Sequence, residues 1–437
     1  KLGTYTGSGS LQTITTGFTP DMVLIKKLAS GEDWAMFNSY SLGDRVHYPR
    51  LQSAGDQFNN RTMFSQSNGF QVPSSSGMVN GSGGTYIYMA VKKNVTQDDT
   101  EENNFNVINY QGSDEDDHFI GGMGFKPDLT ILKLRDSSDD WHWYDSVRGA
   151  GAQLNSASTG TESLQYAKRF DGFFSDGFRV NSSDNEINSD SYDYISYSWR
   201  AGGTWLVNND GSRTSLANAN KTAGFSVVKY FGTGADATIG HGLNSTVEFI
   251  IVKGLETSND WSVLHKDGGD GDFLQLNGTS AESGAGSIFG STFTRPTSSV
   301  FSVGNTGETG TADKEYIAYC WHSVTGKRKF GTYTGNGSAS GTVVEPGFSP
   351  DFVMVKRIDG SSAWGVFDSQ RSGTYYQKGL RFNSTGSEYG ETDANSACEF
   401  LAVGHSDASN GGFRFRDSGS PYNVSSGTYI YWAEKIH

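Results

Sequence analysis

An aspartate followed directly by a tryptophan is the sharpest polar pattern in the sequence. The pair occurs in three similar segments, and a fourth segment keeps the tryptophan behind an alanine. In a binding site, the indole would stack on a sugar ring while the carboxylate accepts hydrogen bonds from its hydroxyls. In a structural role, the indole would lie in a core and the aspartate in the preceding turn. Both interpretations are open for the candidate glycan-binding residues, which are Asp33, Trp34, Asp140, Trp141, Asp260, Trp261 and Trp364.

Two acidic loops form a second candidate site. The segments DGGDGD (267–272) and SDEDDH (113–118) place several carboxylates among glycine or serine residues. Closely spaced oxygen ligands on a flexible loop suit Ca²⁺. Neither segment has the distal glutamate of an EF-hand, so a solvated acidic loop is the alternative. The candidate Ca²⁺ ligands are Asp267, Asp270 and Asp272.

The sequence contains no catalytic signature that combines the right residues with the right spacing. The eight histidines show no HxxxH or HExxH spacing for zinc. Two carboxylates could still face each other for glycoside hydrolysis, because the fold rather than the sequence sets their separation. We therefore expect no catalytic residues and a non-enzymatic protein, with a glycan-degrading enzyme as the open alternative.

The composition excludes several classes of partner. The 437 residues carry a formal net charge of −14, whereas nucleic-acid binding usually needs a basic stripe. No apolar run approaches the length of a membrane span, so we expect no membrane insertion. The two cysteines, Cys320 and Cys398, provide neither a CxxC zinc site nor a disulfide framework.

One phrase recurs four times along the chain. GFTPDMVLIKK begins at Gly17, and similar phrases begin at Gly124, Gly242 and Gly347. Each is preceded by an aromatic strand and followed by the tryptophan segment and a closing segment such as TYIYMAV. The recurrence predicts four repeats. We name them repeats 1 to 4, with predicted bounds 1–92, 105–202, 223–324 and 328–437, joined by short polar linkers.

The pattern within each repeat indicates strands. Short runs rich in Val, Ile, Tyr and Phe alternate with Gly, Ser, Asn and Asp clusters, and no helical apolar period is sustained. The number of strands in roughly 95 residues favours a β-sandwich over a propeller blade. We predict an all-β fold of four tandem jelly-roll or lectin-like sandwiches, each packing its own core independently.

The apolar run inside the repeated phrase indicates a strand that is covered on both faces, either centrally in a sandwich or between the core and a neighbouring repeat. Lys26 ends this run in repeat 1. Its ammonium group is expected to reach water while its stem stays packed.

The phrases FSVVKYFGTG, GFSPDFVMVKR, DWSVLHK and YIAYCW resemble those of tandem β-repeat proteins encoded by marine tailed bacteriophages. The resemblance covers nearly the whole chain. It implies a tail-fibre or similar structural protein on the virion surface, an extracellular particle assembled in the host cytoplasm. The implied partners are other virion proteins and host-surface glycans.

The resembled family supplies no catalytic residues to carry over. A capsid-decorating or spacer protein that binds only other virion proteins is the alternative within this resemblance. A homo-oligomer is expected of such an appendage, although no heptad or collagen-like segment encodes one.

Overall fold

The fold was determined from a computed structural model. The residues that the structure describes are 1–18, 20, 22–28, 34–38, 64–66, 68–72, 77–92, 103–164, 169–181, 186–284, 287–372, 377–389, 398–416, 418 and 420–436. They form two compact units, Lys1–Thr96 and Gln97–His437.

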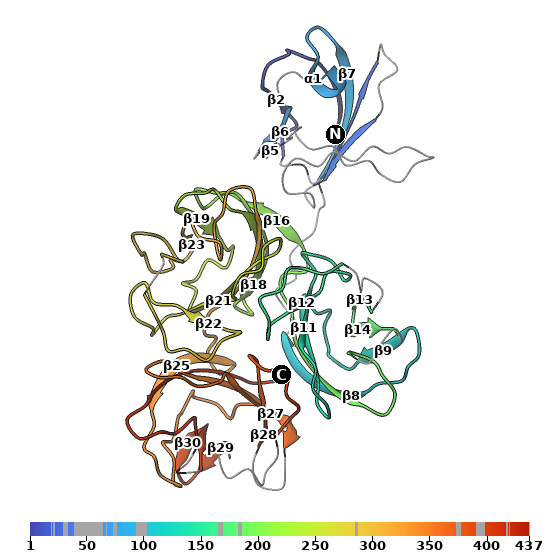
Figure 1. Ribbon diagram of the computed structural model, residues 1–437. Helices are drawn as coiled ribbons and strands as arrows, with labels where there is room; N and C mark the ends of the chain where they lie inside the picture. The colour runs from blue at the N-terminus through green and yellow to red at the C-terminus, as the bar shows by residue number, and fades with distance from the viewer. Residues whose placement is uncertain are drawn as a thin grey trace. The chain divides into compact units, whose positions relative to one another are not determined.

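The N-terminal unit, blue in Figure 1, is a small sandwich of two antiparallel sheets. One sheet has the order β1-β7-β3-β4, with bounds Leu2–Thr6, Thr85–Val91, Met22–Lys27 and Ala35–Asn38. The other is β2-β6-β5, with bounds Gln12–Thr15, Gly69–Val72 and Phe64–Gln66. A single helical turn, α1 (Gly77–Asn80), precedes β7. Buried side chains between the layers, such as Tyr5, Ile25 and Phe70, form its core.

Repeat 2 has the same sheet with one more strand. Its order is β8-β15-β10-β11-β12, with bounds Phe105–Gln111, Asp193–Trp199, Leu129–Leu134, Trp141–Asp145 and Leu154–Asn155. The opposite layer is β9-β14-β13, with bounds His118–Gly121, Gly177–Val180 and Phe170–Phe174.

Repeat 3 keeps this order and adds a hairpin at one edge. Its sheet is β16-β17-β18-β24-β20-β21-β22, with bounds Trp205–Asn208, Ser215–Asn220, Phe225–Phe231, Glu315–Trp321, Phe249–Gly254, Ser262–His265 and Leu274–Gln275. The opposite layer pairs β19 (Ala237–Gly240) with β23 (Val300–Val303). β16 and β17 pair as an antiparallel hairpin, and the segment 209–214 joins them.

Repeat 4 continues its sheet into the second layer. The order is β25-β31-β26-β27-β28-β29-β30, with bounds Arg328–Thr334, Thr428–Glu434, Phe352–Arg357, Gly365–Ser372, Gln377–Arg381, Cys398–His405 and Ala408–Phe415.

The glycine that opens each repeated phrase has a backbone reason to recur. Gly17, Gly124, Gly242 and Gly347 have φ of +92°, +78°, +75° and +96°. L-residues with a Cβ rarely adopt this region, so the turn before each central strand favours glycine.

The predicted all-β, sandwich-like architecture is confirmed, but repeats 2 to 4 do not pack independently. Each has an inner core of its own. One further core draws buried side chains from all three, among them Trp143, Trp321 and Trp432. Figure 1 shows these repeats, teal, yellow-green and orange-red, around a common centre. A sheet in this unit therefore buries both faces, as the apolar run in the phrase predicts.

Candidate functional site

The recurring tryptophans of repeats 2 to 4 lie inside the shared core. All three indole rings are fully buried. Each Nε1–H donates to a backbone carbonyl of another repeat: Trp141 to Arg381 (2.9 Å), Trp261 to Asn155 (3.1 Å) and Trp364 to Gln275 (2.8 Å). Repeat 3 thus bonds to repeat 2, repeat 4 to repeat 3, and repeat 2 to repeat 4, which closes a ring of three.

These contacts correct the glycan interpretation for Trp141, Trp261 and Trp364. A sugar stacks on an exposed ring face, and these rings expose none. Their apolar bodies contribute to the core, and their N–H groups fix the neighbouring strand.

The aspartates before the tryptophans serve local structure. Asp140 Oδ1 accepts hydrogen bonds from the backbone N–H groups of Trp141 (2.8 Å) and Ala157 (3.0 Å). Asp260 Oδ1 accepts from the Asn277 side chain at 2.7 Å. Both aspartates therefore hold turns at the start of the tryptophan strand, as the structural interpretation predicts. In repeat 1, Trp34 is partly exposed, and Asp33 lies outside the described residues.

The lysine that ends the apolar run provides a second set of contacts between the same three repeats. Lys26 of repeat 1 is half-buried. Its counterparts Lys133, Lys253 and Lys356 are fully buried, so the expectation for Lys26 does not extend to these three repeats. Each Nζ donates to a threonine carbonyl of the adjacent repeat: Lys133 to Thr385 (3.3 Å), Lys253 to Thr159 (2.9 Å) and Lys356 to Thr279 (3.1 Å). Burial lowers the pKa of each of these lysines to about 8.

Two of the three junctions also contain a buried arginine–aspartate–tyrosine cluster. Between repeats 2 and 3, Asp145 Oδ2 lies 2.5 Å from Arg148 Nε and accepts from the Tyr319 hydroxyl at 2.8 Å. Burial raises the pKa of Tyr319 well above its usual value. A buried pair with every partner present is stable, whereas loss of one partner leaves an uncompensated charge.

The junction between repeats 4 and 2 repeats this arrangement. Asp368 Oδ2 lies 2.6 Å from Arg371 Nη2 and accepts from the Tyr197 hydroxyl at 2.6 Å. The corresponding position in repeat 3 is His265, whose buried ring packs against Phe249 and Phe330. Burial lowers the pKa of His265 to about 4, so the imidazole at this position of the third junction is uncharged near neutral pH.

The acidic loop at 267–272 does not gather its carboxylates. Asp267 pairs with Lys266 at 2.8 Å, and Asp270 pairs with Arg295 at 2.7 Å. Among the described residues, the loop forms no set of three converging ligand atoms. Neighbouring cations thus pair with two of the three aspartates, and the binding of Ca²⁺ by Asp267, Asp270 and Asp272 stays a prediction.

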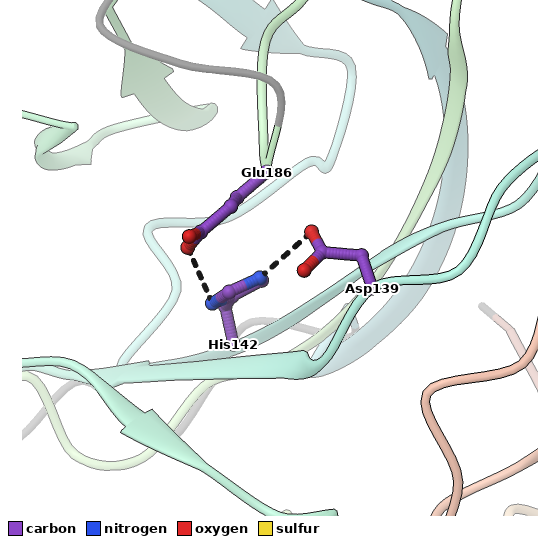
Figure 2. Close-up of side chains that lie close together, drawn as sticks. All are labelled: Asp139, His142 and Glu186. Atoms are coloured by element: carbon purple, nitrogen blue, oxygen red, sulfur yellow. Dashed lines mark hydrogen bonds and ion pairs between the residues drawn. The ribbon is translucent and has the colours of Figure 1, made fainter.

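The described residues contain one cluster with metal-ligand side chains, Asp139, His142 and Glu186. Figure 2 shows the imidazole lying between the two carboxylates. Asp139 approaches Nε2 at 3.2 Å, and Glu186 approaches Nδ1 at 3.6 Å. One ion cannot bind both ring nitrogens at once, and Arg169 already pairs with Glu186. The two carboxylates thus contact opposite nitrogens of one imidazole ring.

An exposed aromatic platform lies on the outer layer of repeat 2. Phe119 on β9 is 46% exposed and meets Phe174 on β13 edge to face, with ring centroids 6.1 Å apart. The Arg179 guanidinium on β14 lies 4.4 Å over the Phe174 ring. Asp117 (2.8 Å) and Asp171 (3.5 Å) hold the same guanidinium by ion pairs. Two ring surfaces and three charged groups thus meet at one exposed place.

A family model described as "Domain of unknown function (DUF7483)" matches residues 1–94 and 100–435. The chain belongs to the DUF7483 family. No curated protein matches the chain. No solved structure matches it. Among the residues that the structure describes, no helix is long and apolar enough to cross a membrane.

The sequence contains a signal for the platform of this DUF7483 chain that the motif search missed. In β9 the buried Ile120 alternates with Phe119, and in β14 the buried Phe178 alternates with Arg179. Strand alternation therefore places the phenylalanine and the arginine on the outward face. Repeat 3 has Thr238 where repeat 2 has Phe119. Searching for residues shared by all repeats overlooks a site that only one repeat carries.

Proposed function

We propose that this protein is a non-enzymatic virion surface protein, a tail fibre or similar appendage, that contacts host-surface glycans through repeat 2. The observation that carries the glycan contact is the exposed platform of Phe119, Phe174 and Arg179. The exposed Phe119 ring offers the apolar surface on which the face of a sugar stacks, and Phe174 and Arg179 support it. The charged groups beside the rings offer donors and acceptors for sugar hydroxyls.

The shared core supports a binding role over a catalytic one. The recurring ionisable side chains that the sequence offers, including Lys253, Asp145 and Arg148, are used for contacts between repeats. Their pairing holds the sandwiches rigidly, and rigid scaffolds that present outward loops are a common arrangement for recognition.

The resemblance to phage structural proteins supports the virion surface as the location and other virion proteins as partners. Weak glycan sites on a particle gain strength through effective concentration when several copies are displayed together. A homo-oligomer would therefore reinforce the platform of repeat 2.

A spacer or capsid-decorating protein is the second candidate. The closed ring of repeats 2 to 4 favours it, because a rigid bead with its recurring polar groups buried can serve purely as a structural unit. Such a protein would bind capsids or other virion components and leave glycans alone.

A glycan array probed with the whole chain tests the proposal. Phe119→Ala and Phe174→Ala should each weaken the positive signals about fivefold, since one ring contact is worth roughly 1 kcal/mol. Arg179→Ala should weaken them similarly. Leu206→Ala is the matched control, because Leu206 is an exposed apolar residue of the C-terminal unit that lies on β16.

Each result decides between the candidates. An array without signals, together with binding to empty capsids, would favour the spacer. Signals that survive all three platform substitutions would show that the platform does not bind the glycan. Release of reducing sugar from a bound glycan would show that the protein is an enzyme.

A further inference from the structure

The N-terminal unit presents an outer sheet face that is covered in every other repeat. The inner face of its sheet β1-β7-β3-β4 lies against the second sheet. The outer face carries large apolar side chains with high exposure: Leu2 77%, Leu28 57%, Val91 40% and Trp34 39%. On the same face, Leu24, Ile87 and Met89 are half-buried.

Strand register identifies the counterparts of these residues in the C-terminal unit. Leu2 pairs with Met89, as Phe330 pairs with Trp432 and as Val227 pairs with Tyr319. The counterparts of Leu2 are buried members of the shared core: Val107, Val227 and Phe330.

The remaining exposed positions follow the same rule. The backbone N–H of Leu28 bonds to the first residue of the closing strand, as those of Arg135, Leu255 and Ile358 do. In repeat 2 this position contacts the neighbouring repeat by an ion pair, between Arg135 and Glu388. Leu255 and Ile358 are buried in the shared core, and so are the tryptophans that correspond to Trp34. The face that repeat 1 exposes is therefore the face by which repeats 2 to 4 contact one another.

The contact in the C-terminal unit has three members and is closed. The final strands of the repeats meet through indoles: the Trp199 and Trp321 ring centroids lie 6.0 Å apart, and Trp432 lies 5.4 Å and 4.7 Å from them. Each of the three faces is covered by the other two repeats.

The centre of the face in repeat 1 suits identical copies. The position of Val91 is occupied by Trp199 in repeat 2, Trp321 in repeat 3 and Glu434 in repeat 4. Glu434 has Arg328 and the Trp199 N–H as partners. Three identical chains would bring three like residues together at this point. Repeat 1 has Val91 and Met89 there, so no like charges would meet.

We propose that three copies of this chain associate through repeat 1, which forms between chains the same three-member core that repeats 2 to 4 form within one chain. Leu2, Leu28, Trp34 and Val91 of each copy become buried. This assignment specifies the homo-oligomer proposed above. It does not rest on glycan binding, because the mass of the assembly is measured without any glycan.

Sedimentation equilibrium of the whole chain in the micromolar range tests the assembly. We expect a mass three times that of the 47.3 kDa chain. Leu2→Glu and Leu28→Glu should each weaken the association by about 100-fold or more, since three carboxylates would be brought into an apolar core. Both leucines are exposed in the single chain, so the substitutions leave its fold intact, which circular dichroism checks.

Leu11→Glu is the matched control within the same unit. Leu11 is 59% exposed but precedes β2 in the opposite layer, away from the proposed face. It should leave the mass unchanged. A monomer or a dimer of the unsubstituted chain overturns the proposal. A trimer that persists in both Leu2→Glu and Leu28→Glu overturns the assignment of the face.

Discussion

Repeat 1 and repeat 3 build the same sheet and differ in what covers it. Leu2 and Trp34 are exposed in repeat 1, whereas their counterparts Val227 and Trp261 are completely buried. The inner face is packed in both repeats. The comparison teaches that one face is enough to form the sandwich, and that the second face of the repeated sheet is an assembly face.

The repeated phrase contains information for both faces. Its alternate residues Val23 and Ile25 enter the core of repeat 1, as Ile250 and Val252 enter that of repeat 3. The intervening residues and the final lysine serve the contact between repeats. The phrase thus recurs for two reasons. In all four repeats it supplies residues to the core of the sandwich, and in repeats 2 to 4 it also supplies the contacts that join the three repeats.

The largest expected effect comes from the two tryptophans at the same place in these repeats. Trp261→Ala should lower the free energy of unfolding of the C-terminal unit by about 3–5 kcal/mol, since it leaves a cavity in the shared core. Trp34→Ala should cost the N-terminal unit less than about 1 kcal/mol in a single chain, because the indole is partly exposed.

Calorimetry at concentrations where the chain is a monomer separates the two units if they unfold in distinct transitions. Each substitution should move the transition of its own unit only. Equal losses for Trp34→Ala and Trp261→Ala would show that the face of repeat 1 is covered within one chain.

Removing one partner of a buried ion pair should have an effect of similar or slightly smaller size. Arg371→Met leaves Asp368 buried without its cation and should destabilise the C-terminal unit by about 3–5 kcal/mol. The double variant Arg371→Met/Asp368→Leu should recover much of the loss, because no charge then stays buried. Urea unfolding followed by circular dichroism measures both. A double variant as unstable as the single one would mean that packing rather than charge dominates the junction.

The sequence predicted the strands and the inner cores because alternation and glycine-bounded apolar runs are local properties. The turn glycines and the covering of the central strand on both faces followed from the same patterns. The role of Trp261 and Lys253 did not follow, because it depends on which neighbour covers the outer face. Identical motifs are exposed in repeat 1 and buried in repeat 3, so no local pattern distinguishes them.

The candidate platform could be predicted only in part, for a related reason. Alternation places Phe119 outward, but its meeting with Phe174 and Arg179 depends on how three strands of the outer layer are aligned. The acidic loop shows the converse. Its spacing suggested a cation site, and the fold brings Lys266 to Asp267 and Arg295 to Asp270, contacts that the spacing did not predict.

The smallest effect that we predict is a change of pH dependence caused by the buried lysines. A lysine has a pKa near 10.4 in an unfolded chain, whereas burial lowers that of Lys253 to about 8. Between these values, the unfolded state binds more protons than the folded state. The free energy of unfolding therefore rises with pH in this window, by at most about 1.4 kcal/mol per pH unit for each such lysine.

Lys253→Met should remove the contribution of Lys253 to this rise in the free energy of unfolding. The difference in slope between this variant and the unsubstituted chain measures that contribution. Burial also raises the pKa values of Cys320 and Cys398, which opposes the rise above the thiol pKa, but both chains share that contribution. Urea unfolding at several pH values between 8 and 9.5 measures the difference. Lys329→Met, on the exposed part of β25, should leave the slope unchanged. Equal slopes for Lys253→Met and the unsubstituted chain would mean that the ammonium group at this junction keeps its proton throughout the window.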